Sequence, residues 1–226
     1  MNNNICEKCG SKIEHYDNDD NDDNDDNIDE LSEWLKLVKK YKNGNYLHLC
    51  NKNIRSIPHD WMSYDIKYLD LSNNNISKIP MDWRPGSITH LDLHDNNISE
   101  IPMDWNPRNI TKLTLSNNII SKISVNWDPK NIEELNLSNN IISYILPNWN
   151  SGNIVFLSLA NNHITDIYSN WNPGKIKYLC IKNNYISYIP NNWNPRNIEC
   201  IYVDRSVIIR SAWKRVYSDV LISYLI

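Results

Sequence analysis

Apolar residues recur along this chain at a fixed spacing of 22 residues. The first apolar column consists of Leu47, Leu69, Leu91, Leu113, Leu135, Leu157, Leu179 and Ile201. A second column lies two residues after the first, and side chains two apart on a strand share one face. Each unit therefore predicts one short strand with two inward side chains. Because one unit cannot bury its apolar positions alone, we expect neighbouring units to stack.

Four further apolar columns have the same period. Three consist mainly of isoleucine and run from Ile54 to Ile208, from Ile57 to Ile189 and from Ile66 to Ile198. The fourth holds seven of the nine tryptophans, namely Trp61, Trp83, Trp105, Trp127, Trp149, Trp171 and Trp193. A row of tryptophans is one way to build a stacking platform for bases or sugars. Because this row is flanked by the isoleucine columns, we predict instead that it belongs to the core.

A polar column separates the strand from the connection in each unit. It holds Asn74, Asn96, Asn118, Asn140, Asn162 and Asn184. An amide carries both donors and acceptors, so a stacked column can satisfy backbone groups where the chain turns away from the strand. Prolines such as Pro85, Pro107 and Pro129 follow the tryptophans. Because proline cannot lie inside a long helix, we expect short turns or 3₁₀ segments on that side.

The repeated line resembles a known family. Residues 88–102 read Ile-x-x-Leu-x-Leu-x-x-Asn-x-Ile-x-x-Ile-Pro, which is similar to the LxxLxLxxNxL motif of leucine-rich repeats. The resemblance covers residues 46–204, as seven full units and a final strand. It implies an α/β solenoid with a curved parallel sheet that binds other proteins on its concave face. The short unit is similar to those of intracellular subclasses.

Both ends of the array carry helical spacing, as expected for caps that cover the terminal units. The N-terminal pattern predicts a cap helix within residues 28–45 and consists of Leu31, Trp34, Leu35, Val38 and Tyr41. The C-terminal pattern predicts a cap helix within residues 205–226 and consists of Ile209, Trp213, Val216, Val220 and Tyr224. Basic residues beginning at Arg210 leave open the alternative that this helix lies on a membrane surface, but we favour its interpretation as a cap.

Charge is concentrated in one segment near the N-terminus. Nine of the 27 acidic residues lie between positions 17 and 30, so the rest of the chain carries 23 − 18 = +5, against −4 for the whole chain. We therefore expect residues 1–27 to form a flexible acidic tail. The basic residues of the array are dispersed rather than gathered in a stripe, so we predict no nucleic-acid partner.

The composition predicts a cytoplasmic location. The chain has no apolar run of about 18 residues and no signal-type stretch at its start. An odd number of cysteines, five, favours a reducing compartment. Asparagine, isoleucine, lysine and tyrosine are abundant, and their AT-rich codons associate the chain with a large DNA virus or an AT-rich protist. In the viral case the location is the host cytoplasm. We expect a monomer that binds no membrane.

Two N-terminal motifs raise the possibility of a metal. Cys6 and Cys9 have the spacing of half a zinc ribbon or knuckle, with His15 nearby. A second ligand pair is missing, so His15 with an acid or a second chain must complete the site, and the alternative is a tail with two free thiols. The acidic run also matches an EF-hand loop, but in more than one register, so we interpret it as a solvated linker. Apart from zinc at the CxxC pair, we predict no cofactor.

Signatures of catalysis are missing from the sequence. It contains neither a phosphate-binding loop nor a GxSxG motif. His90 and His94 fall near Asp92 and Asp95, and this patch is either a metal or acid–base site or ordinary polar surface. We take the second interpretation and predict that the chain is not an enzyme.

Three lanes of side chains should point outward from the predicted strands, because alternate strand residues face opposite sides. The first lane is Tyr46, Tyr68, His90, Lys112, Glu134, Phe156, Tyr178 and Cys200. The second is His48, Asp70, Asp92, Thr114, Asn136, Ser158, Cys180 and Tyr202. The third is Cys50, Ser72, His94, Ser116, Ser138, Ala160, Lys182 and Asp204. These lanes vary while the core columns do not, which indicates freedom to fit a partner.

The sequence therefore predicts a non-enzymatic module that binds an unidentified protein on its concave face. Exposed aromatic residues are frequent anchors of such interfaces. The predicted contact residues are Tyr68, Asp70, His90, Asp92, His94, Lys112, Glu134, Phe156, Tyr178, Lys182 and Tyr202. The alternative is a substrate adaptor of the ubiquitin-ligase type, in which the N-terminal segment recruits other machinery.

Overall fold

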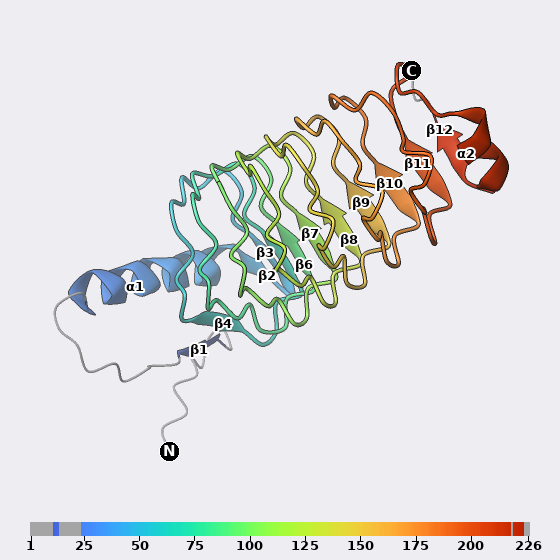
Figure 1. Cartoon of the computed structure of the whole chain (residues 1–226). Coiled ribbons are helices and arrows are strands. Elements are labelled where there is room, and N and C mark those ends of the chain that lie inside the picture. The colour runs from blue at the N-terminus through green and yellow to red at the C-terminus, as the bar shows by residue number, and fades with distance from the viewer. Residues whose placement is uncertain (1–10, 14–23, 218, 224–226) are drawn as a thin grey trace.

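The computed structural model describes residues 11–13, 24–217 and 219–223, and these form a solenoid of stacked units (Figure 1). Each unit contributes one three-residue strand. The parallel strands are β3 (Tyr46–His48), β5 (Tyr68–Asp70), β6 (His90–Asp92), β7 (Lys112–Thr114), β8 (Glu134–Asn136), β9 (Phe156–Ser158), β10 (Tyr178–Cys180), β11 (Cys200–Tyr202) and β12 (Leu221–Ser223). Figure 1 shows the strands on one side of the array and the connecting turns on the other.

The register of the sheet follows the 22-residue period. Strand order is β12-β11-β10-β9-β8-β7-β6-β5-β3-β2, where β2 (Lys42–Asn43) pairs antiparallel with β3. Leu69 lies opposite Leu47 on one side and Leu91 on the other. The expected curved-sheet solenoid class is thus confirmed as a parallel array. The connections between β3 and β11 contain no helix, whereas a short helix joins β11 to β12.

The core lies between the sheet and the turns, and it consists of the apolar columns. Leu113, Leu115 and Trp127 are each at most 1% exposed, and the other units repeat this burial. One member departs from its column: Ile208 is 60% exposed, and Val207 is buried in its place. Ser206 stands in this last unit where earlier units have the ladder asparagine, so the chain enters the turn one residue out of phase.

The tryptophan column is core, as predicted, but it is divided into blocks. Neighbouring rings stack within a block, for example Trp127 and Trp149 with centroids 6.5 Å apart and planes 6° apart. Within a block the indole Nε1 donates to the backbone carbonyl of the preceding tryptophan, as Trp149 does to Trp127 at 3.2 Å. Among the described residues, neither contact joins Trp105 to Trp127 or Trp149 to Trp171.

The asparagine column forms a continuous hydrogen-bonded ladder. In the fourth unit, Asn118 Oδ1 accepts from the amide of Ile98 in the unit before, at 2.9 Å. Its Nδ2 donates to the carbonyls of Leu93, Leu115 and Ser116 at 3.0–3.2 Å. Six asparagines repeat this pattern, from Asn74 to Asn184. Each amide therefore ties two successive units together.

The residue before each ladder asparagine has a left-handed backbone. Asn73, Asp95 and Asn117 have φ of 53°, 52° and 53°, and the following units match. Asparagine and aspartate tolerate this conformation better than most residues. In each Asn-Asn or Asp-Asn pair, the first residue thus forms the turn and the second makes the ladder contacts.

The N-terminal end is covered by a helix, α1 (Asn24–Tyr41). It starts before the predicted 28–45 range and ends within it. Trp34 and Val38 are buried, and the Trp34 ring meets Trp61 edge-on at 5.1 Å. Residues 1–27 are not wholly a flexible tail: β1 (Ser11–Ile13) pairs antiparallel with β4 (Trp61–Ser63). The 22-residue pattern carries no signal for this second, two-stranded sheet, which is why it was not predicted.

The C-terminal prediction of one long cap helix is wrong in extent. The helix α2 covers only Ser211–Val216, and β12 then pairs in parallel with β11. Trp213 is 1% exposed and extends the tryptophan stack beyond Trp193. The apolar run near Val220 fits both a helical and an extended pattern, and the open edge of β11 offers backbone partners that a longer helix would leave unused. No helix among the described residues is long and apolar enough to cross a membrane.

Removal of a ladder amide should destabilise the array strongly. We expect Asn118→Ala to lower the free energy of unfolding by about 2–4 kcal/mol, because several buried backbone groups lose their partner at once. The exposed Asn97→Ala is the matched control and should change it by less than about 0.5 kcal/mol. Urea unfolding followed by circular dichroism measures both, and equal effects would contradict the ladder's role.

The divided tryptophan column gives a second prediction about stability. Trp127 and Trp149 belong to one stacked pair, but Trp127 Nε1 has no acceptor among the described residues. Substitution by phenylalanine removes the indole N–H at both positions. It also reduces the ring volume by a similar amount at each. Trp149→Phe should therefore cost about 1 kcal/mol more than Trp127→Phe, which is the usual net value of one hydrogen bond. Denaturant unfolding of the two variants tests this, and the reverse order would refute it.

Candidate interaction face

The three predicted lanes lie side by side on the outward side of the strands, and we call this surface the sheet face. Its geometry follows from strand alternation: Leu69 is 1% exposed, whereas its neighbours Tyr68 and Asp70 are half-buried on the other side. Parallel pairing places equivalent residues of successive units next to each other, such as Tyr178 beside Phe156. The lanes are therefore physical rows across the sheet.

Stacked rings occupy the N-terminal end of the sheet face. Tyr46 and Tyr68 lie with centroids 4.3 Å apart and planes within 8°. The His90 ring continues the row at 4.4 Å from Tyr68, tilted by 34°. His48 in the second lane also stacks on Tyr46, at 5.9 Å. This cluster is a preformed aromatic surface on β3, β5 and β6.

The imidazole of His90 is held toward its neutral form. Partial burial against its neighbours lowers its pKa below 6.5, and the nearby Lys112 ammonium lowers it further, while Glu134 acts in the opposite direction. The Nδ1 atom lies 2.9 Å from Thr89 Oγ1. A neutral ring can stack on Tyr68 without a charge to solvate, which suits a contact surface.

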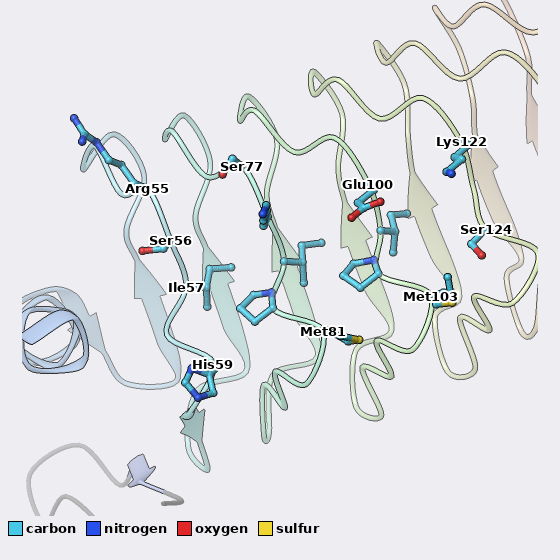
Figure 2. A pocket seen from close by; sticks show the side chains of 15 residues that line it. Arg55, Ser56, Ile57, His59, Ser77, Met81, Glu100, Met103, Lys122 and Ser124 are labelled. Atoms are coloured by element: carbon cyan, nitrogen blue, oxygen red, sulfur yellow. The ribbon is translucent and has the colours of Figure 1, made fainter. Parts of the chain in front are cut away.

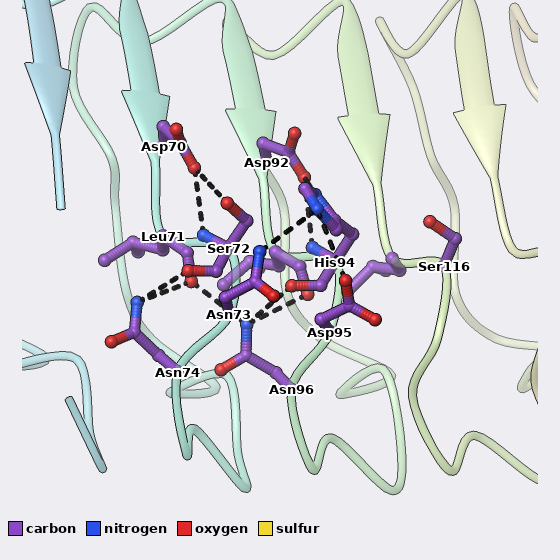
Figure 3. Close-up of polar contacts among 12 residues, drawn as sticks. Asp70, Leu71, Ser72, Asn73, Asn74, Asp92, His94, Asp95, Asn96 and Ser116 are labelled. Atoms are coloured by element: carbon purple, nitrogen blue, oxygen red, sulfur yellow. Dashed lines mark hydrogen bonds and ion pairs between the residues drawn. The ribbon is translucent and has the colours of Figure 1, made fainter. Parts of the chain in front are cut away.

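The aspartates of the second lane have a local structural task (Figure 3). Asp70 Oδ1 accepts from the backbone amide of Ser72 at 3.0 Å and from its hydroxyl at 2.6 Å. Asp92 Oδ1 accepts from the backbone amide of His94 at 3.0 Å, and His94 Nδ1 lies 2.8 Å from it. Both carboxylates thus stabilise the turn after the strand. The sequence pattern predicted partner contacts for both aspartates and a candidate acid–base patch at Asp92, but it did not predict this turn contact.

Ion pairs occupy the middle and the C-terminal part of the sheet face. Lys112 Nζ lies 2.7 Å from Glu134 Oε1, across β7 and β8. Lys177 Nζ lies 2.7 Å from Glu199 Oε1, while the Tyr178 hydroxyl donates to Glu199 Oε2 at 3.1 Å. These hydrogen bonds lower the pKa of Glu199 and raise that of Tyr178. Lys177 and Glu199 lie one residue before the first lane, which is why the sequence analysis omitted them.

The aromatic side chains of the C-terminal part are open to solvent. Phe156 is 37% exposed, as predicted, and Tyr178 beside it is 38% exposed. Cys200, the last member of the first lane, is not exposed but buried. In the sheet register it lies between Tyr178 and Leu221 of the neighbouring strands.

The structure brings together only part of the candidate acid–base patch. His94 lies between two carboxylates, 2.8 Å from Asp92 and 3.5 Å from Asp95, whereas His90 belongs to the aromatic row. Within the described ranges, no group of three or more histidine, cysteine, aspartate or glutamate residues could hold a metal ion. The predicted zinc ligands Cys6, Cys9 and His15 lie outside the described residues.

The lowered pKa of His90 predicts a pH effect. Since the unfolded chain binds this proton more readily than the folded chain does, His90 should reduce stability as pH falls below about 6.5. An NMR titration should give His90 a midpoint below 6.5, and Lys112→Met should move it upward because one cause of the lowering is removed. A midpoint at or above 6.5 in the wild-type chain would contradict the geometry.

Comparison with known proteins matches two parts of the array to family models. Two family models described as leucine rich repeat match the chain, one over residues 45–98 and the other over residues 131–152. A search of the curated proteins found no match. Many solved structures share the fold.

Three of these structures have 18–21% identity to the chain, so they establish the fold alone. A leucine-rich repeat protein from Leptospira interrogans has 21% identity and a TM-score of 0.58, over 70% of this chain and 43% of that one. An internalin C2 from Listeria monocytogenes has 20% identity and a TM-score of 0.60, over 80% of both chains. TLR13, in a complex with ssRNA13, has 18% identity and a TM-score of 0.59, over 71% of this chain and 26% of that one.

This chain spans less than half of the Leptospira protein and about a quarter of TLR13. The likeness therefore extends over only part of each of those two chains. Together, the 22-residue period, the asparagine ladder, the parallel sheet and the matching family models show that the chain folds as an array of leucine-rich repeats.

Proposed function

We propose that this chain is a non-enzymatic interaction module that binds a protein partner through the sheet face. One observation carries the proposal: buried positions repeat almost unchanged from unit to unit, while the outward positions of the same strands differ between most neighbouring units. Stacking fixes the first set, because a changed core residue would disturb two neighbours. The second set is released from that constraint and carries exposed rings such as Phe156 and Tyr178.

The size of the sheet face supports a protein as the partner. Eight strands from β3 to β11 at about 4.8 Å spacing span roughly 34 Å. A standard protein interface buries about 800 Å² on each partner, and a surface of this length accommodates it. Exposed aromatic residues are typical hot spots of such surfaces, which favours Phe156 and Tyr178 as anchors.

The charge of the sheet face favours protein over nucleic acid. Its lanes hold four carboxylates, Asp70, Asp92, Glu134 and Asp204, against two ammonium groups, Lys112 and Lys182. Lys112 is already paired with Glu134. A surface that binds phosphates needs an excess of unpaired cations, and this one has an excess of acids. Although TLR13 was solved with an RNA, this chain's sheet face lacks that electrostatic footprint.

A paired capture experiment tests the proposal. One bait is the wild-type chain, and the second carries Tyr68→Ala, Phe156→Ala and Tyr178→Ala. A third, matched bait carries Tyr64→Ala, Tyr185→Ala and Tyr188→Ala, which removes three exposed tyrosines that lie off the sheet face. We expect a protein that the wild-type and the matched bait retain and the sheet-face bait loses, with a tenfold or greater loss of affinity.

Other outcomes would contradict the proposal. Circular dichroism of all three baits first establishes that they fold alike. If every bait retains the same protein, the sheet face is not the binding surface, and the N-terminal segment with Cys6 and Cys9 becomes the candidate, as the adaptor hypothesis requires. If the retained component is nucleic acid, removed by nuclease, the protein-binding proposal is wrong.

A further inference from the structure

A groove crosses the first four units on a flank of the solenoid away from the sheet face. It has a volume of about 590 Å³ and extends from Arg55 in the first unit to Ser124 in the fourth (Figure 2). The core isoleucines Ile57, Ile79 and Ile101, which are 3–4% exposed, line its floor. Ligand sites commonly have volumes of this order. We propose that this groove binds an extended, acidic and apolar peptide segment of a partner protein.

Two methionines give the groove its apolar wall. Met81 is 60% exposed and Met103 is 51% exposed, in adjacent units. The equivalent positions of two later units carry Ser169 and Asn191, so the fold accepts a polar side chain there. Packing therefore does not require the methionines. Exposed, flexible thioethers side by side are a feature of surfaces that bind apolar side chains of partners.

Cations gather on the opposite wall. Arg55, Lys78 and Lys122 line the groove together with a single acid, Glu100. Figure 2 shows Arg55, Glu100 and Lys122 toward one side and Met81 and Met103 toward the other. None of the three cations forms an ion pair with another described residue. The excess positive charge next to an apolar wall is complementary to carboxylates that alternate with apolar side chains.

The dimensions favour an extended strand-like ligand. Four units at about 4.8 Å spacing give roughly 14 Å along the groove, which fits four or five residues at 3.3 Å each. Alternate side chains of an extended peptide point to opposite sides. Apolar side chains would then face the methionines while carboxylates face the cations.

A displayed library of random 12-residue peptides, selected on the immobilised full chain, tests the inference. We expect the selected peptides to be enriched in aspartate or glutamate alternating with apolar residues. Two variant pairs borrow residues from other units of the same array, so the fold should tolerate them. Met81→Asn with Met103→Asn copies Asn191, and Lys78→Glu with Lys122→Glu copies Glu100. Each pair should weaken the selected peptides tenfold or more.

The sheet-face variant with Phe156→Ala and Tyr178→Ala is the matched control and should bind the same peptides unchanged. Thermal unfolding of all variants verifies that they are folded. The inference is overturned if no selected peptide distinguishes the wild-type chain from the groove variants. It is also overturned if the peptides are enriched in basic residues, or if the sheet-face variant loses them. Because the two surfaces are changed separately, failure here leaves the sheet-face proposal unaffected.

Discussion

The amide of one asparagine per unit is the interaction on which this structure depends. Each ladder asparagine accepts from the backbone of the unit before it and donates to carbonyls of both units. Buried backbone groups at a turn are costly unless they are paired, and here a single side chain pairs four of them. The ladder therefore fixes where every unit leaves its strand. An insertion between a strand and its ladder asparagine would break the contact, and the spacing between Leu113 and Asn118 is the same in every unit that has a ladder asparagine.

The fixed period has a functional consequence. It places the variable outward residues of successive units next to each other as strictly as it places the repeated core residues. The register that stacks Leu69 on Leu91 also sets Tyr68 beside His90 and Phe156 beside Tyr178. The sheet face and the walls of the flank groove are thus built from the positions that stacking leaves unconstrained. The array presents an aromatic and mildly acidic surface on the sheet and a basic, methionine-lined groove on the flank. Because the two surfaces have opposite chemistry, they need not bind the same partner.

Periodic features could be predicted from the sequence, and features without a period could not. The strands, the buried columns and the asparagine ladder follow from residues that recur every 22 positions. Strand β12 escaped because Leu221 and its neighbours occur once and fit a helix equally well. The pairing of β1 with β4 and the gap between Trp105 and Trp127 have no local sequence signal. At the candidate site, the exposure of Phe156 was predictable from alternation, whereas the turn contact of Asp70 depended on side-chain geometry that no pattern encodes.

Native-state hydrogen exchange of the ladder amides tests the central claim most directly. The amides concerned belong to Ile54, Ile76, Ile98, Ile120, Ile142 and Ile164, each of which donates to an asparagine Oδ1 at 2.9–3.0 Å. If the ladder holds the units together, these amides exchange only by large-scale unfolding, as slowly as the strand amides. If they exchange as fast as exposed turn amides while the strands remain protected, the side-chain ladder does not hold the array, and the account is wrong.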